Sequence, residues 1–281
     1  MPQPYECAEQ RSAPARGSRC SLRPVSGSIR SLDMRYSNGI AHYYDFFATV
    51  WGQTDDAARF LIELVPPQSS VLEIGAGVGV TAAALAASGL NVTALEPDPG
   101  MYAVMLSRLA LRPDLEPNLT PIPAAAGYPV PKQFDSCVCF SVLHLLEPSE
   151  RGALVSYAHQ ATRPGGQLVL EIPVVSPKRL PRPWELVAQR QFGEMRYEHH
   201  AAAESLPDGS WHTHWKFRAM HGNLLLDETS QTFHWRPLTL KESDELLRSH
   251  RIGIEAEYTG FDRAPFQPNE SRVRLVVGRA L

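Results

Sequence analysis

The sequence contains no long hydrophobic run and little cysteine. No apolar stretch in the 281 residues approaches the roughly 20 residues that a membrane-spanning helix needs, so we expect no membrane partner. The four cysteines form no Cys-x-x-Cys pair, so neither a zinc site nor a disulfide framework is indicated. Cys137 and Cys139 alternate within an apolar run. We expect reduced, buried thiols on opposite faces of a strand, as in a cytoplasmic protein.

The chain also lacks an excess of positive charge. Lysine and arginine number 27 against 30 aspartates and glutamates, which gives a net charge of −3. Such a balance offers no general means of neutralising phosphates, so we expect no nucleic-acid partner. Residues 1–33 carry arginines among Ser, Pro and Gly but no secretory hydrophobic segment, and we expect a disordered basic extension there.

Short apolar segments alternate with helical patterns from residue 67 to residue 175. Strands that alternate with helices form right-handed βαβ units around a parallel sheet. We therefore predict an α/β, Rossmann-like core with helices on both faces of its sheet. The predicted strands are residues 70–74, 91–95, 119–123, 135–140 and 166–175, and the predicted helices are residues 80–88, 101–111 and 149–162.

Residues 34–66, ahead of this core, are expected to form a helical lid. Apolar residues recur at helical spacing over residues 40–51, which predicts an amphipathic helix. A second helix is predicted at residues 55–64, with Thr54 as its N-cap.

The alternation stops after residue 175, where an insertion of residues 176–239 begins. It is predicted to contain a helix at 184–195 and an antiparallel hairpin of strands 211–219 and 224–235. Residues 240–281 are then expected to complete the core sheet. Their predicted elements are a helix at 240–249 and strands at 254–258 and 273–278.

The segment VLEIGAGVG, residues 71–79, carries the main ligand signature. Gly75, Gly77 and Gly79 follow a predicted strand and open a helix, and glycine lets a ligand lie against the backbone. Glu96 follows the next strand, 19 positions beyond Gly77. Its carboxylate can accept hydrogen bonds from both hydroxyls of a ribose. These features suit any adenosine-containing ligand, dinucleotides included.

Three further details distinguish dinucleotides from other adenosine-containing ligands. The turn is Gly-x-Gly-x-Gly, with Val80 at the position of the last glycine in the dinucleotide fingerprint. Glu73 precedes the turn inside the strand, and the run RPGG at residues 163–166 precedes the fifth strand. Together these features resemble the class I S-adenosylmethionine-dependent methyltransferases across roughly residues 71–175.

The resemblance implies S-adenosylmethionine as the cofactor and a role for each residue around it. Gly75, Ala76 and Gly77 would take the methionine portion, with Glu73 supporting the turn and Glu96 holding the ribose. The residues expected at the adenine and the sulfonium are Pro97, Asp98, Met101, Ala125, Phe140 and Ser141. Related enzymes often place an acidic residue where this chain has Ala124-Ala125-Ala126, so adenine recognition is expected to rely on backbone groups and apolar packing.

The cofactor carries the difficult chemistry, so the enzyme needs only to align a nucleophile and exclude water. His144 lies just beyond the fourth strand and is the candidate base; alternatively, it orders the loop through hydrogen bonds. Tyr36, Tyr43 and Tyr44 come from the N-terminal segment that often folds over the cofactor in this family. Tyr36 is the catalytic candidate, Tyr44 a cofactor contact and Tyr43 a substrate contact, with simple packing as the alternative.

The predicted hairpin is the substrate candidate. In the run WHTHW, alternation places Trp211 and Trp215 on one face, and with Trp184 they are candidate substrate contacts. The alternatives for this face are a homodimer interface or plain hydrophobic packing. His212 and His214 lack a clear carboxylate partner, so we expect no metal site.

The overall layout is similar to that of bacterial small-molecule methyltransferases, such as glycine and sarcosine N-methyltransferase-like proteins. The runs LEPDP and CFSVLHLL and the THW-containing hairpin resemble methyltransferases that tailor ribosomal peptides of the daptide type by dimethylating a terminal amine. We therefore expect N-methylation of an amine in a peptide or small metabolite. The alternative is a natural-product O-methyltransferase with His144 as base.

Other functions fit the sequence less well. A nucleic-acid methyltransferase is disfavoured because residues 140–143 read FSVL rather than Asn/Asp-Pro-Pro-Tyr/Phe. A non-catalytic protein that retains only the fold is disfavoured because the glycine turn and Glu96 are intact.

Overall fold

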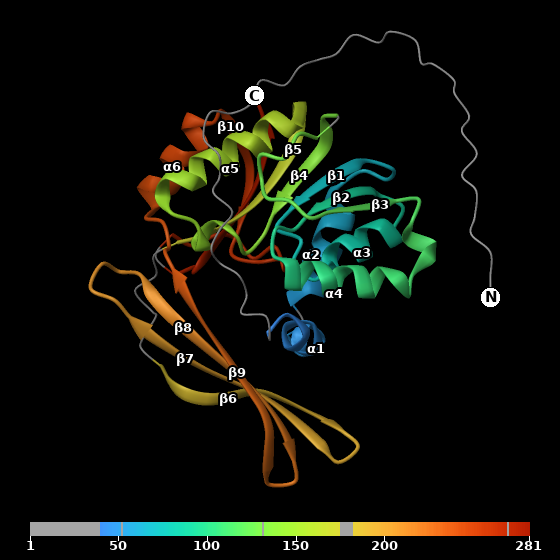
Figure 1. The fold of residues 1–281 in the computed structure, drawn as a ribbon. Coiled ribbons are helices and arrows are strands. Elements are labelled where there is room, and N and C mark those ends of the chain that lie inside the picture. Colours follow the sequence, from blue (N-terminus) through green and yellow to red (C-terminus); the bar gives the residue numbers. More distant parts are fainter. Residues whose placement is uncertain (1–39, 52, 131, 175–181, 269) are drawn as a thin grey trace, which may run out of the picture.

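The computed structural model describes residues 40–51, 53–130, 132–174, 182–268 and 270–281 (Figure 1). The expectations for the extension and for Tyr36 lie outside these ranges. Two separate sheets organise the described chain, one of seven strands and one of four.

The larger sheet has the strand order β10-β11-β5-β4-β1-β2-β3. Its strands are β1 (Ser70–Ile74), β2 (Asn91–Leu95), β3 (Leu119–Ile122), β4 (Phe134–Cys139), β5 (Thr162–Pro173), β10 (Ile252–Tyr258) and β11 (Val273–Ala280). Strands β1 to β5 are parallel, whereas β11 runs antiparallel to both of its neighbours. The chain order reverses between β1 and β4, and open α/β sheets bind ligands outside the carboxyl ends of the strands at such a point. The predicted Rossmann-like sheet is confirmed.

Helices cover both faces of this sheet (Figure 1). On one face lie α2 (Gln53–Leu64), α3 (Val80–Ala87) and α4 (Pro99–Ala110), and on the other lie α5 (Pro148–Ala161) and α6 (Leu240–Ser249). Helix α2 begins ahead of Thr54, so the predicted N-cap is wrong. No helix among the described residues is long and apolar enough to cross a bilayer.

The two cysteines of β4 correct the prediction of opposite faces. Cys137 and Cys139 are both fully buried against α5, whereas Val138 between them packs on the other side. Side chains two positions apart in a strand share a face because the strand period is two residues. The thiols are free, and burial raises the pKa of Cys139 well above its ordinary value. They are core residues.

The insertion forms a sheet of its own, called the second sheet below. Its strands β6 (Arg182–Phe192), β7 (Met195–Ser205), β8 (Trp211–His221) and β9 (Leu224–Trp235) pair antiparallel in chain order. The predicted hairpin is therefore β8 and β9. The helix predicted at 184–195 is wrong, because that segment forms β6 and turns at Gly193 into β7. Pairing with β7 overrides the segment's helical propensity.

Helix α1 (Ala41–Trp51) lies between the core and the second sheet (Figure 1). Its apolar side, with Tyr43 and Phe47, packs against Phe217 of β8 and Phe233 of β9. An ion pair between Asp45 and Arg108 joins α1 to α4. The second sheet therefore reaches the core through α1 and, at Trp235 of β9, through the loop that carries His144.

Candidate active site

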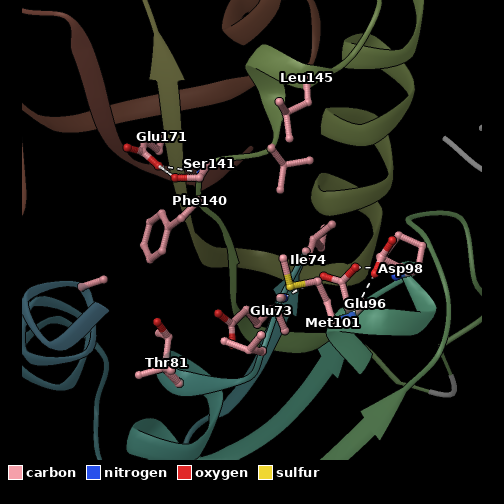
Figure 2. Close-up of a pocket in the computed structure, with 18 of the residues that line it drawn as sticks. Glu73, Ile74, Thr81, Glu96, Asp98, Met101, Phe140, Ser141, Leu145 and Glu171 are labelled. Carbon is pink, nitrogen blue, oxygen red and sulfur yellow. Dashed lines mark hydrogen bonds between the residues drawn. The ribbon is translucent and has the colours of Figure 1, made fainter. Parts of the chain in front are cut away.

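A cavity of about 640 Å³ lies at the carboxyl edge of the central strands. Figure 2 shows Glu73, Glu96 and Met101 grouped on one side of it, with Phe140, Ser141 and Glu171 on the other. The structure brings all the predicted cofactor residues to its walls: Tyr44, Glu73, Gly75, Ala76, Gly77, Glu96, Pro97, Met101, Ala125, Phe140 and Ser141. These residues come from the N-terminal helix and from the ends of several strands, as the parallel sheet requires.

The glycine turn links β1 to α3 and forms one wall. Gly75, Gly77 and Gly79 have φ angles of 76°, 56° and 75°, in the left-handed region that favours glycine. A Cβ on Gly75 would lie 2.4 Å from Cγ2 of Val142, whereas one on Gly77 would meet nothing within 4 Å. Gly75 is thus required by packing against the loop after β4, and the backbone at Gly77 is open to a ligand.

Glu96 fastens the end of β2 to this turn. Its Oε2 accepts a hydrogen bond from the Gly77 N–H at 2.7 Å, and its Oε1 accepts one from the Asp98 N–H at 2.8 Å. Asp98 in turn caps α4, because its Oδ1 accepts from the Met101 N–H at 2.8 Å. Burial raises the pKa of Glu96 to about 7, although both backbone bonds oppose the rise. The carboxylate is therefore held in place before any ligand binds.

Glu73 is the second carboxyl on the side of the cavity where Glu96 lies. Its side chain is only 6% exposed, and its Oε2 has no hydrogen-bond partner among the described residues. Burial, aided by the charge of Glu96, raises the pKa of Glu73 to about 8. A buried acceptor without a partner is rare in native proteins and marks a place for a ligand donor.

The charges around the cavity have one sign. The described residues that line it include the carboxyls of Glu73, Glu96, Asp98 and Glu171, and no lysine, arginine or histidine. A concave site lined by one sign of charge attracts the opposite sign. The cavity therefore suits a cationic ligand and opposes the pyrophosphate of a dinucleotide.

Glu171, on β5, was not predicted. The N–H and Oγ of Ser141 donate to its Oε2 at 2.6 and 2.9 Å, and Ser141 has a left-handed φ of 53°. The sequence signal was a single acidic residue in the apolar run GQLVLEIPVV. Residues 259–261, which follow β10, also line the cavity, and the Phe140 and Phe261 rings meet edge to face at 5.1 Å. No local pattern reveals this second contribution.

The candidate base is not among the lining residues. His144, in the short 3-10 helix η2 (Leu143–Leu145), is 3% exposed and stacks on Trp235 at 3.6 Å between ring centres. Its backbone oxygen accepts from the Arg236 N–H at 3.0 Å. Its neighbours Val142 and Leu145 do line the cavity. The His144 ring thus belongs to the packing between η2 and the second sheet.

The predicted substrate contacts also lie outside the lining. Tyr43 donates to Asp227 Oδ2 at 2.6 Å, and Trp211 stacks with Trp235 at 6.0 Å. Trp184 is 50% exposed, and the ammonium of Lys216 lies over its ring. Trp215 contacts a lining residue: its ring stacks on that of Tyr44, with 5.9 Å between the ring centres.

The second sheet carries one group of metal-binding residue types. Ligand atoms of Glu204, His212 and His214 lie within 4.8 Å of one another, so the structure supplies the carboxylate that the sequence did not reveal. Glu204 is exposed and none of the three lines the cavity. The absence of a metal stays a prediction.

Comparisons with known proteins agree with this geometry. Residues 72–168 match the family model described as "Methyltransferase domain". No significant match was found among curated proteins. The matched segment runs from β1 into β5 and contains the glycine turn and Glu96.

Several solved structures share the fold. The CcbJ methyltransferase from Streptomyces caelestis has a TM-score of 0.71 at 21% identity, over 88% of this chain and 98% of that one. The sugar N-methyltransferase KedS8 from a Streptoalloteichus species has a TM-score of 0.65 at 18% identity, over 95% and 99%. The glycopeptide N-methyltransferase MtfA, complexed with S-adenosylmethionine, has a TM-score of 0.54 at 21% identity, over 82% and 95%.

Fold and domain match together define the class: the chain is a methyltransferase with the class I fold. Its cofactor is S-adenosylmethionine, whose adenosyl group suits the glycine turn with Glu96 and whose sulfonium and ammonium suit a cavity lined by carboxyls. The predictions of class and cofactor are confirmed.

Proposed function

We propose that the chain transfers a methyl group from S-adenosylmethionine to the nitrogen of an amine in a natural-product peptide or a small metabolite. The observation that carries the proposal is the lining of the cavity, in which the described residues offer four carboxyls and no basic group. Such a lining attracts an ammonium and repels an anion. The names of KedS8 and MtfA, which act on a sugar nitrogen and a glycopeptide nitrogen, support an amine acceptor.

Within the cavity, the half nearest β1 and β2 would hold the cofactor. The open backbone at Gly77 and the unpartnered Oε2 of Glu73 would take the methionine portion. Glu96 would hold the ribose hydroxyls while keeping its bond to Gly77. Pro97, Met101 and Ala125 would border the adenine.

The opposite half would align the acceptor. When bound, the cofactor supplies an electrophilic methyl group, so the protein must present a nitrogen lone pair in line and exclude water. Phe140 and Leu145 are apolar lining groups there, and Tyr44 stands against Trp215 of the second sheet. Burial raises the pKa of Tyr44 to about 12, so it remains a neutral phenol. Helix α1 and the second sheet would thus cap the acceptor side.

The base that the sequence predicts for an alcohol acceptor lies outside the cavity lining. His144, the candidate for that role, stacks on Trp235 and does not line the cavity. An amine acceptor instead needs only to lose its proton before attack. O-methylation is therefore the alternative outcome of the test rather than the proposal.

The proposal is tested by product analysis. The purified chain is incubated with a trideuteromethyl cofactor and a panel of peptides with free amino ends, amino sugars and phenols, and the products are identified by mass spectrometry. We expect label on nitrogen, and His144→Ala should retain transfer. Label on oxygen that disappears in His144→Ala would replace the proposal with O-methylation.

A further inference from the structure

One carboxyl of the cavity is not used by the proposed cofactor half. Glu171 lies at the end of β5 on the side away from Glu73 and Glu96, beside Phe140 and Ser141 (Figure 2). Among the described residues that line this side of the cavity, Glu171 is the one with an ionisable carboxyl. A charge placed there, at the buried end of the strand, is costly unless something compensates it.

Part of the compensation comes from Ser141. Both Ser141 bonds, from its N–H at 2.6 Å and its Oγ at 2.9 Å, end on the same oxygen of Glu171, Oε2. Oε1 receives no hydrogen bond from the described residues, although Glu171 lines the cavity. One oxygen is thus fixed by the protein, and the other is available to a ligand.

Among the described residues, the groups that act electrostatically on Glu171 carry no positive charge. Tyr44 of α1 and Cys139 of β4 interact electrostatically with the carboxylate. Both are neutral at neutral pH because burial raises their pKa values. Burial also raises the pKa of Glu171 above its ordinary value, against the effect of the Ser141 bonds. The described lining supplies no counter-ion to this carboxyl, so a cation that enters the cavity would supply one.

The neighbouring wall is aromatic. Phe140 lines the cavity from the end of β4, and Phe261 meets it edge to face at 5.1 Å from the loop after β10. Aromatic faces attract ammonium groups, methylated ones included. A carboxylate beside an aromatic wall is therefore a recognition site for an alkylammonium rather than for an alcohol.

From this arrangement we propose that Glu171 holds the ammonium of the acceptor through Oε1 and removes its proton before methyl transfer. This inference rests on the proposed function. An alkylammonium gives one proton to Oε1, which leaves a neutral amine and a neutral carboxyl. The nitrogen lone pair then forms the new bond to the methyl carbon, and the electron pair of the broken carbon–sulfur bond stays on sulfur. The N-methylammonium product leaves, and Glu171 releases its proton to water.

The alternative is that Glu171 only orders the loop after β4. Its bonds to Ser141 hold a strained left-handed residue next to Val142, which packs against Gly75. Two variants separate these roles. Glu171→Gln keeps an oxygen that can accept the Ser141 bonds but removes the charge, whereas Ser141→Ala removes one bond and keeps the charge.

The experiment measures binding rather than turnover. The protein is first saturated with S-adenosylhomocysteine, which fills the cofactor half, and is then titrated with benzylamine or with benzyl alcohol at neutral pH. Affinities are followed by ligand-observed NMR. The two probes have the same shape and differ in charge.

We expect the wild-type protein to prefer benzylamine by about tenfold, as one charge-assisted hydrogen bond would give. Glu171→Gln should abolish the preference with little change in S-adenosylhomocysteine affinity, and Ser141→Ala should retain it. Equal binding of the two probes by wild type, or an unchanged preference in Glu171→Gln, would overturn the inference. Failure to bind S-adenosylhomocysteine at all would instead overturn the assignment of the cofactor half.

Discussion

The Gly77 N–H donates to Oε2 of Glu96 at 2.7 Å, so the carboxylate that ends β2 is fastened to the glycine turn that ends β1. The second oxygen of Glu96 accepts the Asp98 N–H at 2.8 Å. Two elements separated in sequence are thereby locked into one ligand-binding edge. Because the carboxylate is already oriented, little order is lost when a ribose replaces water there.

Replacing Glu96 tests this edge. In Glu96→Gln the charge is lost and one strong acceptor of ribose hydroxyls is weakened, so we expect S-adenosylhomocysteine to bind about ten- to a hundredfold more weakly, in line with hydrogen bonds to charged groups. Isothermal titration measures the change. Glu63→Gln is the matched control, because Glu63 is an exposed carboxylate paired with Arg263 outside the cavity. Equal affinities of the two variants would contradict the role of Glu96.

The raised pKa values predict that cofactor binding depends on pH. In the ligand-free protein, Glu96 has a pKa of about 7 and Glu73 of about 8, so both are largely protonated at pH 6. A cationic ligand favours the ionised carboxylates, so protons must leave when it binds at low pH. The affinity for S-adenosylmethionine should therefore rise from pH 6 to about pH 8 and then level off. Titration calorimetry in two buffers of different ionisation enthalpy would also detect the released protons, and a flat profile would exclude this coupling.

Glu73 is expected to lower the folding stability of the ligand-free protein at alkaline pH. An unfolded glutamate ionises near pH 4.3, whereas the folded Glu73 keeps its proton to about pH 8. Stability from this group is thus complete in acid and is lost as the pH rises through the folded pKa. Glu73→Gln should raise the Tm of the ligand-free protein at pH 8 and reduce the Tm increase that S-adenosylhomocysteine produces. Thermal unfolding with and without ligand gives both values, and a lower Tm without ligand would show that Glu73 is stabilising.

Gly75 should tolerate substitution less well than Gly77. A Cβ at Gly75 would meet Val142 Cγ2 at 2.4 Å, while one at Gly77 has open space, and both positions share the left-handed φ. We expect Gly75→Ala to cost about 2–4 kcal/mol, from strain plus overpacking, and Gly77→Ala about 1 kcal/mol. Denaturant unfolding checks this order. Adding Val142→Ala to Gly75→Ala should recover part of the loss, and a purely additive double variant would argue against the contact.

The cofactor half was predictable because its signals are local in sequence. Gly75, Gly77 and Glu96 follow successive predicted strands, and parallel strands place such ends at one edge. Glu171 reaches the same cavity from a later strand, and Phe261 from beyond the second sheet, so no spacing connects them. The position of His144 outside the lining was not predictable for the same reason, because its stacking partner Trp235 comes from a distant strand.

The prediction for residues 184–195 failed for another reason. The segment WELVAQRQFGEM contains good helix formers, and its strand form depends on pairing with β7, which follows it across the turn at Gly193. In the structure Gln189 pairs with Glu198, and β7 pairs in turn with β8. The hairpin of β8 and β9 was recognisable from its alternation, but the two added strands were not.

The cavity, whose described lining carries carboxyls and no basic side chain, is expected to bind S-adenosylmethionine at the Glu96 edge. The most direct test is isothermal titration of the purified chain at pH 8 with S-adenosylmethionine and, separately, with a reduced nicotinamide dinucleotide. We expect saturable binding of S-adenosylmethionine that is weakened in Glu96→Gln, and no binding of the dinucleotide. Binding of the dinucleotide without S-adenosylmethionine would contradict the account.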